Sequence, residues 1–149
     1  MPELTNEQLI ERAISVVRPT RIGDRLVGDV GCALLTDKGN VYLGVCIDTG
    51  SGTGFCAEHS AIAAMVTAGE YRIRKIVAVW LDGTDAYVLS PCGRCREFIR
   101  QIDPGNMETE VILGNDNVST LAELLPCSDW FHKLGGTRTV EKQLASAGG

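Results

Sequence analysis

Two short segments of the chain hold the residues best suited to chemistry. In "FCAEH" a thiol, Cys56, stands two positions before a carboxylate, Glu58, directly after the glycine-rich run "DTGSGTG". In "SPCGRC" the thiols of Cys92 and Cys95 are separated by two residues. Two thiols three positions apart in the first turn of a helix share a face, and the positive end of the helix dipole lowers their pKa. Such a pair suits metal binding or redox chemistry.

The spacing of Cys92 and Cys95 alone leaves three interpretations open: a redox pair, half of a zinc ribbon, or two ligands of a catalytic zinc. A structural zinc needs four closed ligands, and the chain has no second CxxC and only two separated histidines, His59 and His132. An open site with Cys56 as third ligand leaves one position for water, whose pKa zinc lowers to about 7. A stabilising zinc in an inactive domain is the competing interpretation.

Glu58 would act as the proton carrier beside that water. Positions 56 and 58 of a regular helix point in nearly opposite directions, so we expect Cys56 at the helix cap, where both side chains face the metal. Three thiolates around a dication leave about one net negative charge, which weakens the acidification of water unless cations offset it. Arg94 and Arg96 are the cations expected to lie just outside the ligands.

The composition bounds the remaining possibilities. The chain has 149 residues, 44% hydrophobic and 22% charged, which is typical of one globular domain. Its net charge of -5 is unsuited to the phosphate backbone, so we expect neither nucleic acid nor an editing activity on polynucleotides. No apolar run approaches the ~20 residues of a membrane span, and no export signal is evident, so a cytoplasmic protein is expected. Cys32, Cys46 and Cys127 are interpreted as small apolar residues.

Hydrophobic periodicity predicts the elements that position these residues. The expected order is a helix over 5–17, a hairpin of strands over 28–36 and 40–47, a helix over 56–68, a strand over 75–81, a helix after 92, a strand over 109–114 and a short helix. Two successive strand-helix-strand crossovers favour an α/β fold, a three-layer α/β/α sandwich with a mixed sheet of about five strands. We expect a single domain over 1–134 and a tail over 135–149 that is partly disordered or docks on a neighbouring subunit.

The two motifs together resemble the cytidine deaminase family. "CAE" at 56–58 and "SPCGRCRE" at 90–97 match the three-cysteine form of the zinc-deaminase pattern. "VGCALL" at 30–35 and "ELLP" at 123–126 also look like family positions, so the resemblance covers about residues 25–130. It implies a cytidine deaminase-like fold and a cytoplasmic enzyme of pyrimidine salvage.

The reaction that the resemblance implies is hydrolytic deamination of free cytidine or deoxycytidine to the uridine nucleoside and ammonia. One Zn²⁺ per chain would be held by Cys56, Cys92 and Cys95, and the zinc-bound hydroxide would attack C4 of the ring. Glu58 would take the proton from the water, protonate N3 and deliver a proton to the departing amine.

The resemblance also implies substrate and subunit contacts. Ala57 and Ser90 would contact the base through their backbone, and Asp48 would accept a hydrogen bond from the sugar. Relatives of this length are commonly homotetramers, with a dimer as the other expectation. An aromatic residue after "ELLP" then reaches the neighbouring subunit's pocket, which makes Trp130 or Phe131 a candidate substrate contact.

Three departures from the family pattern bear on the substrate. The sugar-binding Asn-x-Glu-Asn is replaced by "CIDT", in which Cys46 and Thr49 stand for the two asparagines. Gly28 falls where an aromatic residue often packs on the base, and His59 where many relatives have arginine. These changes predict a roomier pocket. "SPCGRCR" with "TGSGTG" also resembles blasticidin-S deaminases, so a modified cytosine nucleoside is the alternative substrate.

Overall fold

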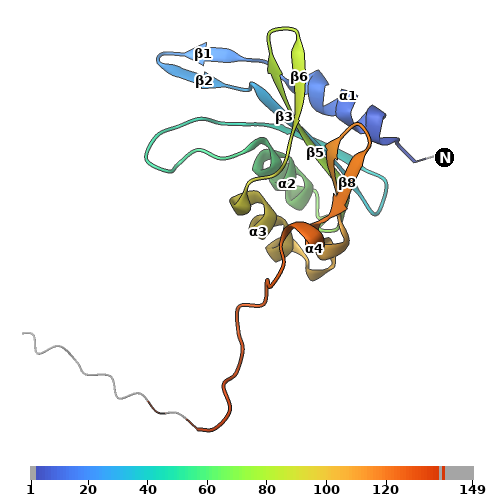
Figure 1. The fold of residues 1–149 in the computed structure, drawn as a ribbon. Helices are drawn as coiled ribbons and strands as arrows, with labels where there is room; N and C mark the ends of the chain where they lie inside the picture. The colour runs from blue at the N-terminus through green and yellow to red at the C-terminus, as the bar shows by residue number, and fades with distance from the viewer. Residues whose placement is uncertain (1–2, 138, 140–149) are drawn as a thin grey trace, which may run out of the picture.

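The fold is built on one six-stranded mixed sheet between layers of helices (Figure 1). The computed structural model describes residues 3–137 and 139. The sheet order is β4-β3-β5-β7-β8, with β6 paired to β5 beside β7. Its strands are β3 (Val30–Thr36), β4 (Val41–Val45), β5 (Ile73–Asp82), β6 (Asp85–Leu89), β7 (Glu110–Gly114) and β8 (Asn117–Thr120). The helices are α1 (Asn6–Val16), α2 (Ala57–Thr67), α3 (Gly93–Ile102), the 3-10 helix η1 (Pro104–Glu108) and α4 (Leu121–Leu124), and β1 (Thr20–Ile22) and β2 (Arg25–Val27) form a separate ribbon.

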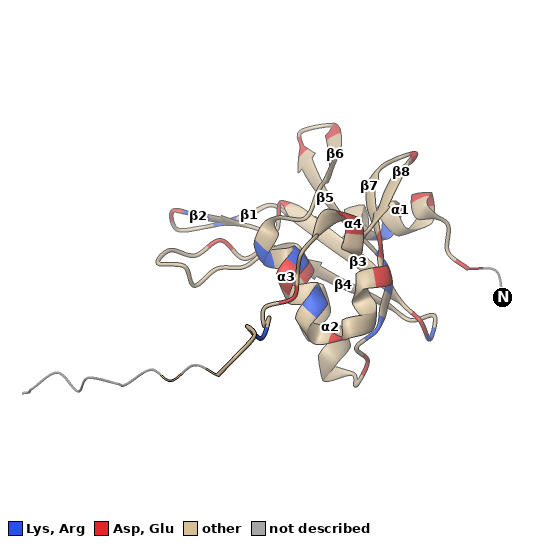
Figure 2. Cartoon of the chain, turned by 60° about the horizontal axis from the view of Figure 1, so that its bottom comes forward, with Lys and Arg blue, Asp and Glu red and all other residues tan. Residues whose placement is uncertain are grey.

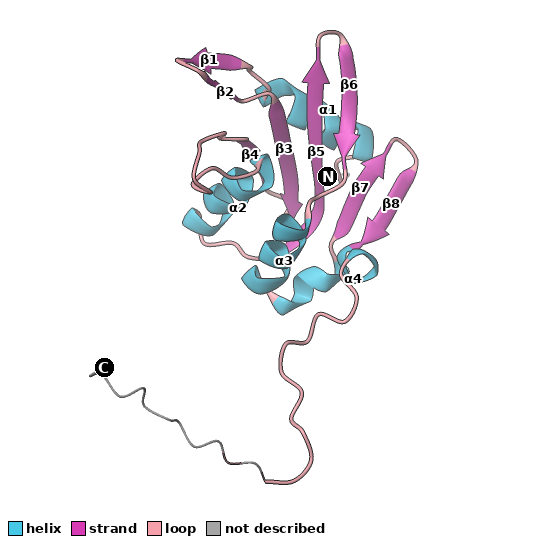
Figure 3. Ribbon diagram, turned by 60° about the vertical axis from the view of Figure 1, so that its left-hand side comes forward, coloured by secondary structure: helices cyan, strands magenta, loops and turns pink. Residues whose placement is uncertain are grey.

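The three-layer prediction is confirmed, since α1 covers one face of the sheet and α2 and α3 cover the other (Figure 3). Successive side chains of a strand point to opposite faces. Cys32 and Leu34 of β3 therefore pack with α2 and α3, whereas Ala33 and Leu35 pack with α1. The two faces form two apolar clusters, and β3 and β5 are buried on both sides.

The first helix forms where the capping signal predicts it. Thr5 is the N-cap of α1, its hydroxyl accepts from the backbone N–H of Gln8, and the Gln8 side chain accepts from the N–H of Thr5. This capping box satisfies two backbone donors that the first turn leaves without partners. Leu9, Ile10 and Ala13 are buried against the sheet, as the apolar spacing predicts.

The mixed character of the sheet comes from one parallel pair. β3 and β4 form the predicted antiparallel hairpin, and β3 also pairs antiparallel with β5. β5 and β7 run parallel, with Lys75 opposite Glu110 and Ile76 opposite Val111. The chain between them passes through β6 and α3, so the expected crossover is present.

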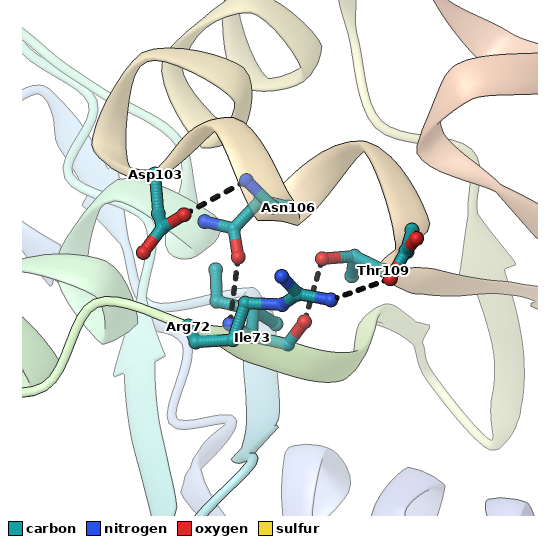
Figure 4. Close-up of polar contacts among 7 residues, drawn as sticks. Arg72, Ile73, Asp103, Asn106 and Thr109 are labelled. Carbon is teal, nitrogen blue, oxygen red and sulfur yellow. Dashed lines mark hydrogen bonds and ion pairs between the residues drawn. The ribbon is translucent and has the colours of Figure 1, made fainter.

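Polar side chains of η1 fix the start of β5 against the end of α3 (Figure 4). Asn106 is fully buried, and its side-chain oxygen accepts from the backbone N–H of Ile73 at 2.8 Å while its amide donates to the carbonyl of Ile99 at 3.1 Å. Thr109 donates its hydroxyl proton to the carbonyl of Ile73 at 2.6 Å. Buried polar groups satisfied in this way hold the parallel strands in register.

A second polar contact ties the β3–β4 hairpin to the end of α2. Glu70, just after α2, is 6% exposed and accepts from the Tyr42 hydroxyl and, at 2.9 Å, from the Asn40 amide. The hydrogen bond from Tyr42 is the main cause that lowers the pKa of Glu70 below its ordinary value.

Glycine allows α2 to approach the sheet closely. A Cβ atom at Gly44 of β4 would lie 2.3 Å from the backbone nitrogen of Ala61 in α2. Ser60, the residue before, donates its hydroxyl proton to the carbonyl of Val45 at 2.7 Å. The beginning of α2 is therefore held directly on β4.

Candidate active site

The two cysteine segments are the starts of α2 and α3, at one end of the sheet. Cys56 is the N-cap of α2 with φ -70° and ψ 160°, and Cys92 is the N-cap of α3 with φ -68° and ψ 168°. Both residues are extended rather than helical, so Cys56 and Glu58 are freed from the opposite directions of a regular helix. Cys95 lies in the first turn of α3 and is fully buried.

The three thiols lie together although they come from two helices. The Sγ atoms of Cys56 and Cys92 are 3.8 Å apart, and those of Cys92 and Cys95 are 3.5 Å apart. Cys56 and Cys95 also belong to one group of potential ligand atoms that lie within 4.8 Å of one another. A tetrahedral zinc with Zn–S bonds of about 2.3 Å separates its sulfur ligands by about 3.8 Å. The spacing of the thiols therefore fits one zinc ion.

The thiols differ in how readily they ionise. Burial opposes ionisation of Cys92, but hydrogen bonds from the backbone N–H of Cys95, from the thiols of Cys95 and Cys56 and from the backbone N–H of Arg94 together outweigh it and lower the pKa of Cys92. Burial raises the pKa of Cys56 and of Cys95 above the ordinary thiol value. Zinc binds thiolates, so binding must release the protons of the two less acidic thiols.

Glu58 is buried beside these sulfurs. Its side chain is 5% exposed, and burial is the main cause that raises its pKa above the ordinary carboxyl value. A raised pKa makes a carboxyl a stronger base than usual, which suits a proton shuttle.

A cavity of about 520 Å³ is lined by Cys56, Cys92 and Glu58. Of the residues that sequence reasoning assigned to substrate binding, Asp48, Ala57 and Ser90 all line it. Trp130 does not: it is 61% exposed, and the guanidinium of Arg100 lies 4.9 Å from the centre of its ring. Within one chain, Trp130 thus lies apart from the other candidate residues.

The arginines of α3 make internal contacts. Arg94 lines the cavity and donates to the carbonyl of Gly54 in the glycine-rich loop at 3.1 Å. Arg96 lies behind the cavity and donates to the Pro91 and Leu124 carbonyls and to the Ser90 hydroxyl. Figure 2 shows lysine and arginine residues interspersed with acidic ones over the fold rather than gathered in one stripe. Arg96 therefore supports the turn that carries Cys92.

Several residues that line the cavity were not predicted from the sequence. Phe55, Asp29 and Arg25 line the cavity. The thiol of Cys46 donates to an Asp29 carboxylate oxygen at 3.1 Å. Cys46, which replaces the first asparagine of the family's sugar-binding pattern, therefore contacts an acidic residue that the sequence analysis did not single out. Phe55 could have been recognised from its place directly before Cys56. Asp29 and Arg25 carry no local signal, because only the packing of β2 and β3 brings them to the cavity.

The absence of an aromatic residue at position 28 has a backbone cause. Gly28 has φ +79°, and a Cβ atom there would lie 2.5 Å from the carbonyl oxygen of Arg18. Arg18 also donates its backbone N–H to the carbonyl of Gly28 at 2.8 Å, closing the β1–β2 ribbon. A side chain at this position would collide with Arg18, and Gly28 does not line the cavity, so the expectation of a roomier pocket stays a prediction.

His59 lies directly beside the thiol of Cys95, whereas the sequence alone left open whether it lies behind the metal ligands or at the surface. It is 9% exposed, its Nδ1 is 3.7 Å from Cys95 Sγ, and its ring stacks on Phe98 with centroids 4.4 Å apart. Burial and the charge of Arg94 lower the pKa of His59. The sequence gives no sign of this contact, because residues 59 and 95 come together only when α2 and α3 pack against each other.

A family model, the zinc-binding region of cytidine and deoxycytidylate deaminases, matches residues 4–110. The chain belongs to this family. Family membership and the thiol spacing agree on one zinc ion per chain.

Individual relatives of this chain are also named as deaminases. A "Cytidine deaminase" of Halalkalibacterium halodurans is 34% identical over 102 residues, 65% of this chain and 74% of that protein. A "Blasticidin-S deaminase" of Bacillus cereus is 35% identical over 103 residues, 65% and 74% of the two chains. A "Probable cytidine deaminase" of Dictyostelium discoideum is 39% identical over 70 residues, 46% of this chain, and the match spans just under half of that relative, 46%.

The family resemblance extends to the whole fold. The solved structure of a cytidine deaminase from Burkholderia pseudomallei superposes with a TM-score of 0.68 at 28% identity, covering 85% of this chain and all of that one. Across the described residues, no helix is both long and apolar enough to cross a membrane.

Proposed function

We propose that this protein hydrolytically deaminates free cytosine nucleosides, cytidine or deoxycytidine, to the uridine nucleoside and ammonia. The observation that carries the proposal is a buried carboxyl, Glu58, in the wall of the same cavity as the thiols of Cys56 and Cys92. A zinc site that served only stability would need neither an adjacent cavity nor this carboxyl.

The zinc ligands in this proposal are Cys56, Cys92 and Cys95. When bound there, zinc supplies Lewis-acid chemistry, lowering the pKa of water to about 7 so that it can attack the ring near neutral pH. Glu58 would accept a proton from the attacking water and pass it to the ring nitrogen N3, and would then take the remaining hydroxyl proton of the C4 adduct and deliver it to the leaving amine. Burial supports both roles, because the raised pKa of Glu58 brings its protonated and ionised forms closer in energy.

The cavity supports a nucleoside rather than a polymer. Its volume of about 520 Å³ lies within the range of roughly 300–1,000 Å³ of small-molecule sites. Ala57 and Ser90 would contact the base through their backbone, next to the metal ligands Cys56 and Cys92. Asp48 would accept from a sugar hydroxyl, as a carboxylate one carbon shorter than the glutamate of the family pattern.

A blasticidin-S-type nucleoside is the second candidate, and the weaker one. One observation favours room for a sugar substituent: the cavity is lined by Gly52 and Gly54, which carry no side chains. The relatives named cytidine deaminase support the first candidate. A panel of cytidine, deoxycytidine, blasticidin S and N4- or C5-substituted cytosines, with ammonia release as readout, ranks the substrates.

The experiment that tests the proposal is Glu58→Gln. This change keeps the shape of the side chain and removes the proton carrier, so we expect the loss of cytidine absorbance to slow by about 10²–10⁴-fold, the typical contribution of general acid-base catalysis. Zinc should stay at one ion per chain. A Glu58→Gln variant that deaminates cytidine at the parental rate would contradict the acid-base role of Glu58.

The proposal extends to assembly and location. We infer a homotetramer, or failing that a dimer, in which Trp130 or Phe131 reaches the pocket of a neighbouring subunit. The support is exposure, since Trp130 is 61% and Phe131 90% exposed in the single chain. A soluble cytoplasmic enzyme of pyrimidine salvage is the setting that fits free nucleosides as substrates.

A further inference from the structure

The ring of His59 lies beside the thiol of Cys95 and outside the lining of the cavity. His59 follows Cys56 by three residues on α2, and its Nδ1 faces Cys95 Sγ at 3.7 Å. The ring is 9% exposed and does not line the cavity, whereas Cys56 and Cys92 do. A polar ring so placed is either a metal ligand or a hydrogen-bond partner of the ligands.

A zinc site with one open position takes three protein ligands, so one of the four side chains Cys56, His59, Cys92 and Cys95 stays outside the coordination shell. Ligand atoms of Cys56, His59 and Cys95 all lie within 4.8 Å of one another, and Cys92 lies outside that group. The sulfur of Cys92 is 3.8 Å from that of Cys56 and 3.5 Å from that of Cys95, so it too lies at the spacing of a zinc ligand. Tetrahedral zinc brings sulfur and nitrogen ligands to about 3.6 Å of each other.

The choice between His59 and Cys92 follows from their surroundings. Cys92 faces the cavity, where the open position must lie, and receives backbone N–H groups that favour its thiolate. His59 stacks on Phe98, which lies one turn after Cys95 on α3, with planes inclined by 8°. The stacked ring is fixed with its Nδ1 edge towards Cys95 Sγ, an acceptor once it is a thiolate.

We propose that His59 is a positioning residue which donates its Nδ1–H to the thiolate of Cys95 and does not ligate the metal. This inference rests on the zinc site of the proposed function. Three thiolates leave about one net negative charge around a dication, and a donor on one sulfur withdraws part of that charge. The neutral ring also orients Cys95, so that the open position stays directed at the cavity.

The test compares the zinc affinity of the full-length protein and its variants by competition with a chelator. We expect His59→Ala to bind zinc about 10–100-fold more weakly, the usual loss for a hydrogen-bond partner of a ligand. His59→Asn, whose amide places a donor near Nδ1, should recover most of the affinity. His132→Ala, the chain's other histidine, is the matched control and should bind zinc as the parent does.

X-ray absorption of the zinc-loaded protein separates donor from ligand. We expect three sulfurs and one lighter atom around zinc, both in the parent and in His59→Ala. Two sulfurs in the parent would make His59 a ligand and overturn the proposal. Unchanged zinc affinity in His59→Ala also overturns it, and so does a His59→Asn variant as weak as His59→Ala, since packing alone would then explain the loss.

A measurement on the parent protein covers the case in which the variants do not fold. Long-range ¹H–¹⁵N spectra of the zinc-loaded protein should show His59 protonated on Nδ1, and a ring protonated on Nε2 alone refutes the donor role. None of these readouts uses turnover. Failure of the Glu58→Gln test thus leaves this inference standing, and unchanged zinc affinity in His59→Ala leaves the proposed function standing.

Discussion

Single residues decide the chemistry of the site, and the sequence identifies most of them by type and spacing. Cys56, Glu58 and the two cysteines of "PCGRC" could be singled out because each spacing has a mechanical reason. His59 could not be placed, because one histidine beside a thiol in sequence carries no information about another helix. Its position emerges only from the packing of α2 on α3.

In the proposed function, three of the six cysteines are zinc ligands and the other three are small core or surface residues. Cys92→Ser replaces a thiolate by a hydroxyl that does not ionise, so we expect zinc content well below one per chain and loss of deamination. Cys127→Ser is the control, because Cys127 is exposed and lies apart from the cavity. The zinc content of the purified, folded variants tests whether Cys92 is a ligand. Equal zinc content in the two variants would show that Cys92 is not a ligand.

Elements predicted from the sequence are those with a buried face. α1, α2, the β3–β4 hairpin, β5 and β7 match the apolar patterns closely. The β1–β2 ribbon, β6 and β8 were missed because most of their residues are exposed or half-buried and show no apolar alternation. These strands depend on pairing partners that only the folded chain provides, as between β5 and β6.

The contact between β4 and α2 allows a packing prediction. Gly44→Ala places a methyl group where the nearest backbone nitrogen would be 2.3 Å away, so α2 must shift. We expect the free energy of unfolding to fall by about 1–3 kcal/mol, the usual cost of overpacking. Gly135→Ala, with nothing within 4 Å, should change it by less than about 0.5 kcal/mol. Denaturant unfolding of the zinc-loaded variants measures both.

The contact between Glu70 and the hairpin allows a pH prediction. The Tyr42 hydroxyl lowers the pKa of Glu70, so the ionised carboxylate stabilises the fold at neutral pH. This stabilisation is lost as the pH falls below about 4.3, the value in the unfolded chain, and through the lower pKa of Glu70 in the folded protein. Tyr42→Phe should therefore be less stable than the parent near pH 7, and the difference in the free energy of unfolding between the two should become smaller at acidic pH. Denaturant midpoints from pH 7 to 3 test this, and a constant difference would contradict it.

At the scale of the whole molecule, two apolar clusters hold the sheet between its helices, and their members lie between Leu4 and Leu124. The expected domain over 1–134 remains a proposal that these clusters support. Residues 138 and 140–149 of the expected tail lie outside the described residues. Among those described, no helix or strand follows α4. A chain ended after Leu134 should unfold at the parental temperature and keep its zinc.

The exposed aromatic residues after α4 allow an assembly prediction. Trp130 and Phe131 present apolar surface that a subunit contact would bury. We expect light scattering to give about four times the chain mass of 16.0 kDa. Trp130→Ala with Phe131→Ala should shift the mass towards smaller species and raise the KM for cytidine while leaving zinc in place. A parental KM in that variant would exclude these residues from the substrate site.

The turn between β3 and β4 has a practical consequence. Residues 37–40 are all exposed and join the two strands at the end opposite Val30 and Cys46, which line the cavity. A biotin-bearing cysteine introduced at Lys38 would anchor the protein to a sensor chip with its pocket turned towards the flowing liquid. Ligands could then be screened on the immobilised protein without the tether crossing their path.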